Sequence, residues 1–137
     1  EVSSDAIYAL FNATYLQPSG GWELGNYQLT RSDSGDQLTV TLKTEQGDAS
    51  LTGTGQGVVE AFVGAMETFT GHKIVLVEYS EHTLGKSADA EAVCYIQLNI
   101  DGARPCGVGK SGDIVHATLS AILSALQTYV GEASAAA

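Results

Sequence analysis

An internal repeat constrains the fold of this chain more than any other feature of its sequence. The run Leu51-Thr52-Gly53-Thr54-Gly55, leading into Val58-Val59-Glu60-Ala61, matches Pro105-Cys106-Gly107-Val108-Gly109, leading into Ile114-Val115-His116-Ala117, with two extra residues in the second copy. Each copy ends with one helix that can cover one face of the strands before it. Two copies are therefore expected to pack as a pseudo-twofold pair.

The first copy reads as three strands followed by a helix. Strands are predicted over residues 23–31, 37–44 and 49–54, and in the second of them apolar Leu38, Val40 and Leu42 alternate with polar residues. The short, turn-rich connections at 34–36 and 46–48 favour antiparallel neighbours. After Gly57 the apolar period changes to that of a helix, which Gly71 ends.

The second copy repeats this order. Strands are predicted over residues 73–82, 90–100 and 104–108, and a helix over residues 113–130. The fold class is therefore α+β: two pseudo-symmetric βββα units, antiparallel sheets with helices packed on them, preceded by one helix at residues 4–16. The breaker cluster that starts at Pro18 separates a linker or subdomain helix (1–18) from the main domain (19–131), whose repeats cover about 22–71 and 72–131. We expect residues 132–137 to form a disordered tail.

The charge balance excludes several kinds of partner. The 137 residues, one ordinary domain in length, carry 6 Lys and Arg against 16 Asp and Glu, a formal net charge of −10. Such a chain repels phosphate backbones and anionic lipid surfaces, so nucleic acid and membrane are not expected as partners. Without a run of 18 apolar residues or a signal peptide, the expected location is cytoplasmic.

The sequence offers no catalytic or metal-binding constellation. His72, His82 and His116 are far apart, and no spacing typical of a metal site occurs. Cys94 and Cys106 are interpreted as buried thiols, because a chain with this capacity for a core needs no disulfide. This favours a binding or regulatory module without a metal or cofactor.

The glycine-rich segment 107–112 formally matches a dinucleotide-binding motif but lacks its context. No further strand follows the next helix, and a phosphate-binding loop would need a glycine in place of Arg104. Two interpretations remain for the Gly-x-Gly segments of the two copies. They deliver free backbone N–H groups at a helix start to an anion such as a carboxylate, or they only permit a tight turn from strand to helix.

Several separated motifs resemble one known family. The run 53–57, the run Val77-Glu78-Tyr79-Ser80-Glu81-His82-Thr83-Leu84-Gly85, the run 89–92 and the run 107–109 followed by Asp113-Ile114 resemble the C-terminal regulatory domain of 2-isopropylmalate synthases. The match covers roughly residues 22–130. The helix at residues 4–16 resembles the last helix of the subdomain that joins this regulatory part to the catalytic barrel.

The resemblance implies a feedback sensor for leucine in an acyltransferase that condenses acetyl-CoA with 2-oxoisovalerate. The fragment itself would be non-catalytic, and the divalent metal would belong to the catalytic barrel of the same polypeptide, which is absent here. Leucine would lie at a homodimer interface. The positions that the resemblance assigns to leucine binding are Gly55, Gly57, Val59, Glu60, Leu76, Tyr79, Thr83, Ala90, Lys110, Ser111 and Gly112.

Two alternatives remain open. A citramalate synthase has a similar domain that senses isoleucine, and the choice between two isomers depends on pocket shape. The other alternative is a structural dimerisation module whose glycines pack helices and bind no ligand. An amino acid needs donors for its carboxylate, acceptors for its ammonium group and an apolar slot, and paired helix starts beside small and apolar residues can supply these.

Overall fold

Two three-stranded antiparallel sheets, each with one helix, form the part of the chain that the computed structural model describes, residues 22–44, 47–85 and 90–136. The first unit consists of β1 (Glu23–Ser32), β2 (Gly35–Thr44), β3 (Gly47–Gly55) and α2 (Val58–Thr70). The second consists of β4 (Ile74–Leu84), β5 (Glu91–Ile100), β6 (Cys106–Ser111) and α3 (Ile114–Ala136). The predicted α+β class with two βββα units is confirmed. The helix predicted at residues 4–16 lies outside the described residues.

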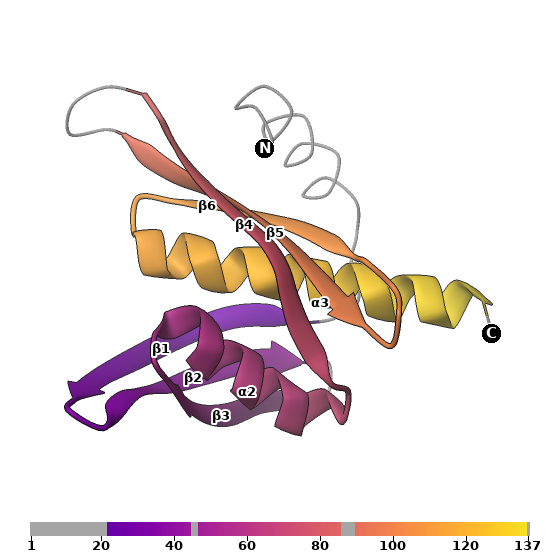
Figure 1. Cartoon of the computed structure of the whole chain (residues 1–137), viewed down its shortest axis with the longest axis horizontal. Helices are drawn as coiled ribbons and strands as arrows, with labels where there is room; N and C mark the ends of the chain where they lie inside the picture. The colour runs from indigo at the N-terminus through magenta and orange to yellow at the C-terminus, as the bar shows by residue number, and fades with distance from the viewer. Residues whose placement is uncertain (1–21, 45–46, 86–89, 137) are drawn as a thin grey trace.

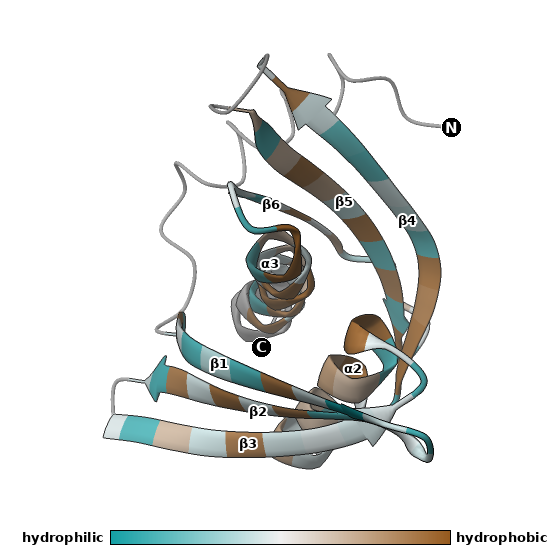
Figure 2. Cartoon of the chain, turned by 90° about the vertical axis from the view of Figure 1, so that its left-hand side faces the viewer, coloured by the Kyte–Doolittle hydropathy of each residue, from teal (hydrophilic) through white to brown (hydrophobic). Residues whose placement is uncertain are grey.

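The sheets form the outer layers and the helices lie between them (Figure 1). Helix α2 packs on β3 and β2, and α3 packs on β6 and β5. In the view of Figure 2, α3 is seen end-on between the two sheets, with α2 beside it on the first sheet. The two helices also contact each other, so the units share one interior. None of the described helices is long and apolar enough to cross a membrane.

The alternating pattern of β2 places its apolar side chains against the helices. Leu38, Val40 and Leu42 are fully buried in one cluster with Phe62 and Met66 of α2. Burial of each such side chain contributes about 1.5–3 kcal/mol. The central strand β5 and the helix α3 supply the rest of this cluster, which includes Cys94, Ile96, Leu98, Ile100, Leu119, Ile122 and Leu126. Both cysteines are free thiols, Cys94 buried and Cys106 half-buried.

Glycines inside β3 and β6 allow each helix to approach its sheet closely. A Cβ atom on Gly53 would lie 1.9 Å from the carbonyl oxygen of Ala61, and one on Gly109 would lie 2.1 Å from that of Ala117. Ala61 and Ala117 are themselves equivalent, because their N–H groups bond to the carbonyls that open the two helices. Gly53 therefore corresponds to Gly109, and the match of Gly53 with Gly107 that the sequence indicated is wrong by two residues.

The glycine motifs of both units are parts of strands. The segments 53–55 and 107–109 lie within β3 and β6 rather than in turns. No extra residues separate strand from helix in the second unit, because the strand predicted at 104–108 instead runs over 106–111. Proline at position 105 has no N–H group to donate to a ladder, which explains the later start.

The last helix is longer than its apolar pattern indicated. It was predicted to end at residue 130, but α3 continues to Ala136, into the segment expected to be a disordered tail. Residues 131–136 have the sequence GEASAA, and alanine has the highest intrinsic preference for a helix.

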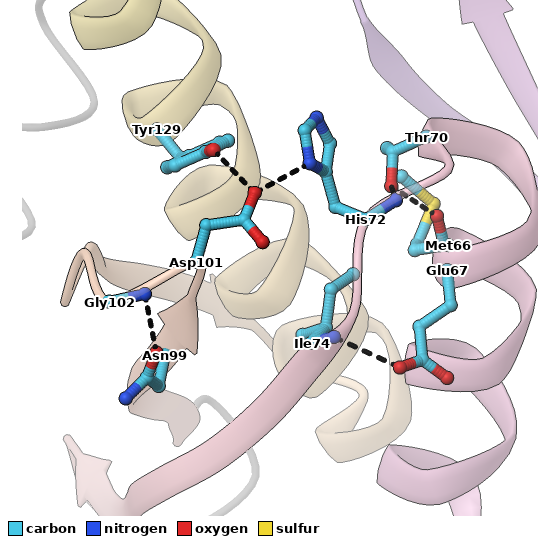
Figure 3. Close-up of polar contacts among 9 residues, drawn as sticks. All are labelled: Met66, Glu67, Thr70, His72, Ile74, Asn99, Asp101, Gly102 and Tyr129. Atoms are coloured by element: carbon cyan, nitrogen blue, oxygen red, sulfur yellow. Dashed lines mark hydrogen bonds and ion pairs between the residues drawn. The ribbon is translucent and has the colours of Figure 1, made fainter.

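Polar contacts fix the connection from α2 to β4, the point where the chain passes from one unit to the next (Figure 3). A Glu67 carboxylate oxygen accepts a hydrogen bond from the N–H of Ile74 at 2.9 Å. His72 Nδ1 lies 2.9 Å from an Asp101 carboxylate oxygen, which also accepts the hydroxyl of Tyr129 at 3.1 Å. The hydrogen bond to Ile74 fixes the first residue of β4, and so it helps to position the exposed surface of that strand.

Candidate functional site

A pocket of about 680 Å³ lies where the starts of both helices meet the first half of β4. Its volume is in the range typical of small-molecule sites, and its lining is mostly aliphatic. Both units contribute to it. The residues that line it are Gln56, Gly57, Val58, Val59, Glu60, Val63, Ile74, Val75, Leu76, Tyr79, Ile114, Val115 and Thr118.

The start of α2 faces this pocket without a side-chain cap. Gly57 is its N-cap residue and makes no side-chain hydrogen bond, and a Cβ atom on it would meet nothing within 4 Å. The N–H groups of a first helical turn have no partner within the helix, and the helix dipole gives them a partial positive charge. The start of α2 can therefore accept an anionic group from outside.

The equivalent start of α3 is closed by a side chain of the chain itself. Asp113 occupies the position that Gly57 has in the first unit, and its carboxylate accepts the N–H of Val115 at 2.9 Å. The other carboxylate oxygen accepts the hydroxyl of Tyr27. The hydrogen bond from Tyr27 is the main reason why the pKa of Asp113 is lowered from its ordinary value.

Tyr79 occupies the position in β4 that Tyr27 has in β1. Each follows a bulge, between Leu24 and Tyr27 in β1 and between Leu76 and Glu78 in β4. The Tyr79 hydroxyl lies 3.4 Å from that of Thr118 and donates to Glu81 at 3.1 Å. Burial raises the pKa of Tyr79 to about 12, so its hydroxyl is neutral at pH 7.

The outer part of the site is an exposed apolar surface on an edge strand. Val75, Leu76 and Val77 of β4 are 48%, 41% and 42% exposed. Figure 2 shows this first part of β4 as a hydrophobic band beside α2. In the second sheet the strand order is β4-β5-β6, so one edge of β4 has no partner strand among the described residues. An edge of this kind is suited to contact with another chain.

The residues predicted for leucine binding fall into three groups. Those in the pocket lining are Gly57, Val59, Glu60, Leu76 and Tyr79. A second group lies at the other end of the second sheet, outside the pocket. Thr83 of β4 and Ser111 of β6 both pair with Ala92 of β5, and Ala90 immediately precedes β5. Lys110 pairs with Val93, and its ammonium group lies 3.4 Å from the carboxylate of Glu91.

Two further predicted glycines are not part of the pocket lining. Gly55 ends β3, and a Cβ atom on it would lie 2.8 Å from both Cβ and Cγ of Glu60. Gly112 lies between β6 and α3, with open space around it. The close contact at Gly55 gives that residue a packing role beneath the Glu60 side chain.

Sequence reasoning missed the contribution of α3 to the pocket. Ile114, Val115 and Thr118 line it from the second unit, together with Val63 of α2 and Ile74 and Val75 of β4. The helical spacing of Ile114, Val115 and Thr118 places them on one side of α3. The repeat could have indicated them, because Ile114 and Val115 correspond to Val58 and Val59, which also line the pocket.

These features define an α+β domain of two βββα units with an aliphatic pocket between its helix starts. The chain belongs to the family described as the LeuA allosteric (dimerisation) domain, whose model matches residues 1–130. The resemblance noted from the sequence is thereby confirmed.

Curated relatives agree with this assignment. The chain is 35% identical over 140 residues to a 2-isopropylmalate synthase of Leifsonia xyli, a match that covers 95% of the chain and 23% of the relative. It is 34% identical over 127 residues to the enzyme of the same name from Thermobifida fusca, a match that covers 92% of the chain and 22% of the relative. The 2-isopropylmalate synthase of Pseudomonas entomophila is 30% identical to the chain over 140 residues, a match that covers 100% of the chain and 24% of the relative. The chain thus spans about a quarter of the length of these relatives.

Proposed function

We propose that this chain is the feedback-sensing domain of a 2-isopropylmalate synthase and that its pocket binds L-leucine at an interface between two copies. The observation that carries the proposal is the aliphatic pocket of about 680 Å³ at the uncapped start of α2. The relatives support the assignment to this enzyme, since each is named 2-isopropylmalate synthase and is about four times as long as the chain.

The uncapped start of α2 suits the carboxylate of a ligand. At the start of α3 the chain's own Asp113 carboxylate accepts a backbone N–H of the first turn and a tyrosine hydroxyl. The start of α2 has glycine in the same position and Tyr79 on the equivalent strand. A ligand carboxylate at α2 would occupy the place that Asp113 fills at α3.

The aliphatic lining of the pocket suits the side chain of leucine. Val59, Val63 and Leu76 present aliphatic groups to the pocket from α2 and β4, and Val115 does so from α3. Burial of a leucine side chain among such groups contributes about 1.5–3 kcal/mol. Together with charge-assisted hydrogen bonds this supports a micromolar to millimolar dissociation constant, which suits a feedback sensor.

The exposed edge of β4 suits contact with a second copy of the chain. The pocket adjoins the exposed apolar edge of β4, and the matching family is named for dimerisation. Apart from Gly55 and Gly112, the predicted leucine-binding residues lie in two separate groups on one chain, in the pocket lining and near Ala92. Two such groups would complete one site if each came from a different chain, which supports a site shared across a homodimer. The catalytic barrel of the same polypeptide would receive the signal.

Calorimetric titration of the purified chain with L-leucine, L-isoleucine and L-valine tests the proposal. We expect leucine to bind at least about fourfold more tightly than valine, because a missing methylene costs about 0.8 kcal/mol. Tighter binding of isoleucine would instead support the alternative of an isoleucine-sensing citramalate synthase domain. If none of the three amino acids bound to a dimeric chain, the structural dimerisation module would be the better account.

A further inference from the structure

The pocket lining contains one charged side chain. Glu60, in the first turn of α2, is the only Asp, Glu, Lys, Arg or His among the lining residues. The other ionisable group of the lining is the phenol of Tyr79, whose pKa burial raises to about 12. The formal charge of the lining is therefore a single negative charge, on Glu60.

The position of Glu60 is set by the strand beneath it. Its Cβ and Cγ lie so close to Gly55 that a Cβ atom on that glycine would be 2.8 Å from each. The same added atom would lie 2.9 Å from the backbone nitrogen of Ala61, so the clash could not be relieved by moving the glutamate alone. The glycine at the end of β3 thus allows the stem of Glu60 to lie over the strand at the edge of the pocket.

A simple carboxylic acid is a poor match for this arrangement. Its carboxylate would approach the uncapped start of α2, whose first turn also carries Glu60, in a chain with a net charge of −10. Like charges at short range repel, and the repulsion is larger where the site is partly desolvated. A ligand that also carries a cationic group beside its carboxylate removes this repulsion and adds a charge-assisted hydrogen bond.

We infer that the Glu60 carboxylate binds the ammonium group of the effector and so makes the site selective for an amino acid over the 2-oxo acid with the same carbon skeleton. The inference rests on the proposed function and adds the group on which selectivity depends. In the 2-oxo acid a carbonyl oxygen replaces the ammonium group, and that oxygen is an acceptor facing another acceptor. The site would therefore disfavour the oxo acid for two reasons: its carbonyl oxygen has no donor opposite it, and it lacks the positive charge that Glu60 would bind.

Calorimetric titration with three related probes tests this inference. The probes are L-leucine, 4-methyl-2-oxopentanoate, which lacks the ammonium group, and 3-methylbutylamine, which lacks the carboxylate. We expect the unmodified chain to prefer leucine over the oxo acid at least tenfold. Glu60→Gln should lose most of this preference through weaker binding of leucine and of the amine, while the affinity for the oxo acid stays the same or rises. Glu60→Asp, which keeps the charge, should retain part of the preference.

The matched control is Asp48→Asn, which makes the same change in net charge at an exposed position of β3 outside the pocket. It should leave the preference unchanged. The role of Glu60 would be overturned if Glu60→Gln weakened the binding of leucine and of the oxo acid equally, or if Asp48→Asn lost as much of the preference as Glu60→Gln. Either result would leave standing the proposal that the site binds leucine. Failure of leucine to bind the unmodified chain would overturn the proposed function itself, and this inference with it.

Discussion

At the scale of single residues, one side-chain pair connects the two units. The hydroxyl of Tyr27 in β1 donates to the carboxylate of Asp113, which in turn caps the start of α3. The first turn of α3 supplies Ile114 and Val115 to the pocket, so this pair holds one wall of the site from the opposite unit. It also shows how the chain itself satisfies a helix start of the type that α2 leaves open.

The pair predicts a defined dependence of stability on pH. The folded-state pKa of Asp113 is lowered, so its contribution is present above the ordinary pKa of an aspartate and is lost as the pH falls through the folded value. Tyr27→Phe should raise the pKa of Asp113 and lower the free energy of unfolding at pH 7 by at most about 1 kcal/mol, because the pair is largely exposed. NMR titration of the Asp113 carboxyl measures the pKa. An unchanged pKa in the variant would show that Tyr27 does not act on Asp113.

Some site residues could be recognised from the sequence and others could not. Gly57 and Tyr79 lie in motifs that resemble the family, and the resemblance also assigns Glu60 to the ligand site; all three line the pocket. The packing role of Gly55 beneath Glu60 depends on a distance between β3 and α2, and a linear pattern carries no such distance. Thr118 was missed because its neighbours on α3 read as part of the core stripe.

At the scale of elements, periodicity identified the described strands and helices, and backbone contacts decided their bounds. The pattern of β2 predicted its buried face, and Leu38, Val40 and Leu42 are fully buried. The predicted strands ended before Gly55 and Gly109, which were assigned to the turns that lead into the helices. They are strand residues instead, and the reason is the contact with a helix that lies above each of them.

Matched substitutions of two glycines test this account of helix packing. Gly53→Ala places a methyl group 1.9 Å from the carbonyl oxygen of Ala61, and we expect it to lower the free energy of unfolding by about 3 kcal/mol or more. Gly64→Ala, within α2 itself, meets only Thr54 at 3.9 Å and should raise the free energy of unfolding by about 0.5–1 kcal/mol. Denaturant unfolding of both variants measures the difference. Equal effects would mean that α2 does not lie as close to β3 as described.

At the scale of the whole molecule, the repeat predicted two units, and the structure shows why two units make a site that one cannot. The pocket takes walls from α2, β4 and α3, so it exists only where the second unit packs against the first. Its outer part continues into the exposed Val75, Leu76 and Val77 of the β4 edge. The exposure of these three residues could not be predicted from periodicity, because a run of consecutive apolar residues in a strand normally reads as part of a core.

The central claim is that a second copy completes the leucine site at the edge of β4. Sedimentation velocity with and without L-leucine, on the unmodified chain and on Val77→Asp, tests it most directly. Val77 is 42% exposed and lies outside the pocket lining, and Gln28→Asp on β1, an edge strand of the other sheet, is the matched control. We predict that the unmodified chain is a dimer and that leucine lowers its dissociation constant. Val77→Asp should raise the dissociation constant of the dimer at least about tenfold and weaken leucine binding in parallel. Gln28→Asp should change neither. A chain that remains a monomer at high concentration and still binds leucine would contradict the claim.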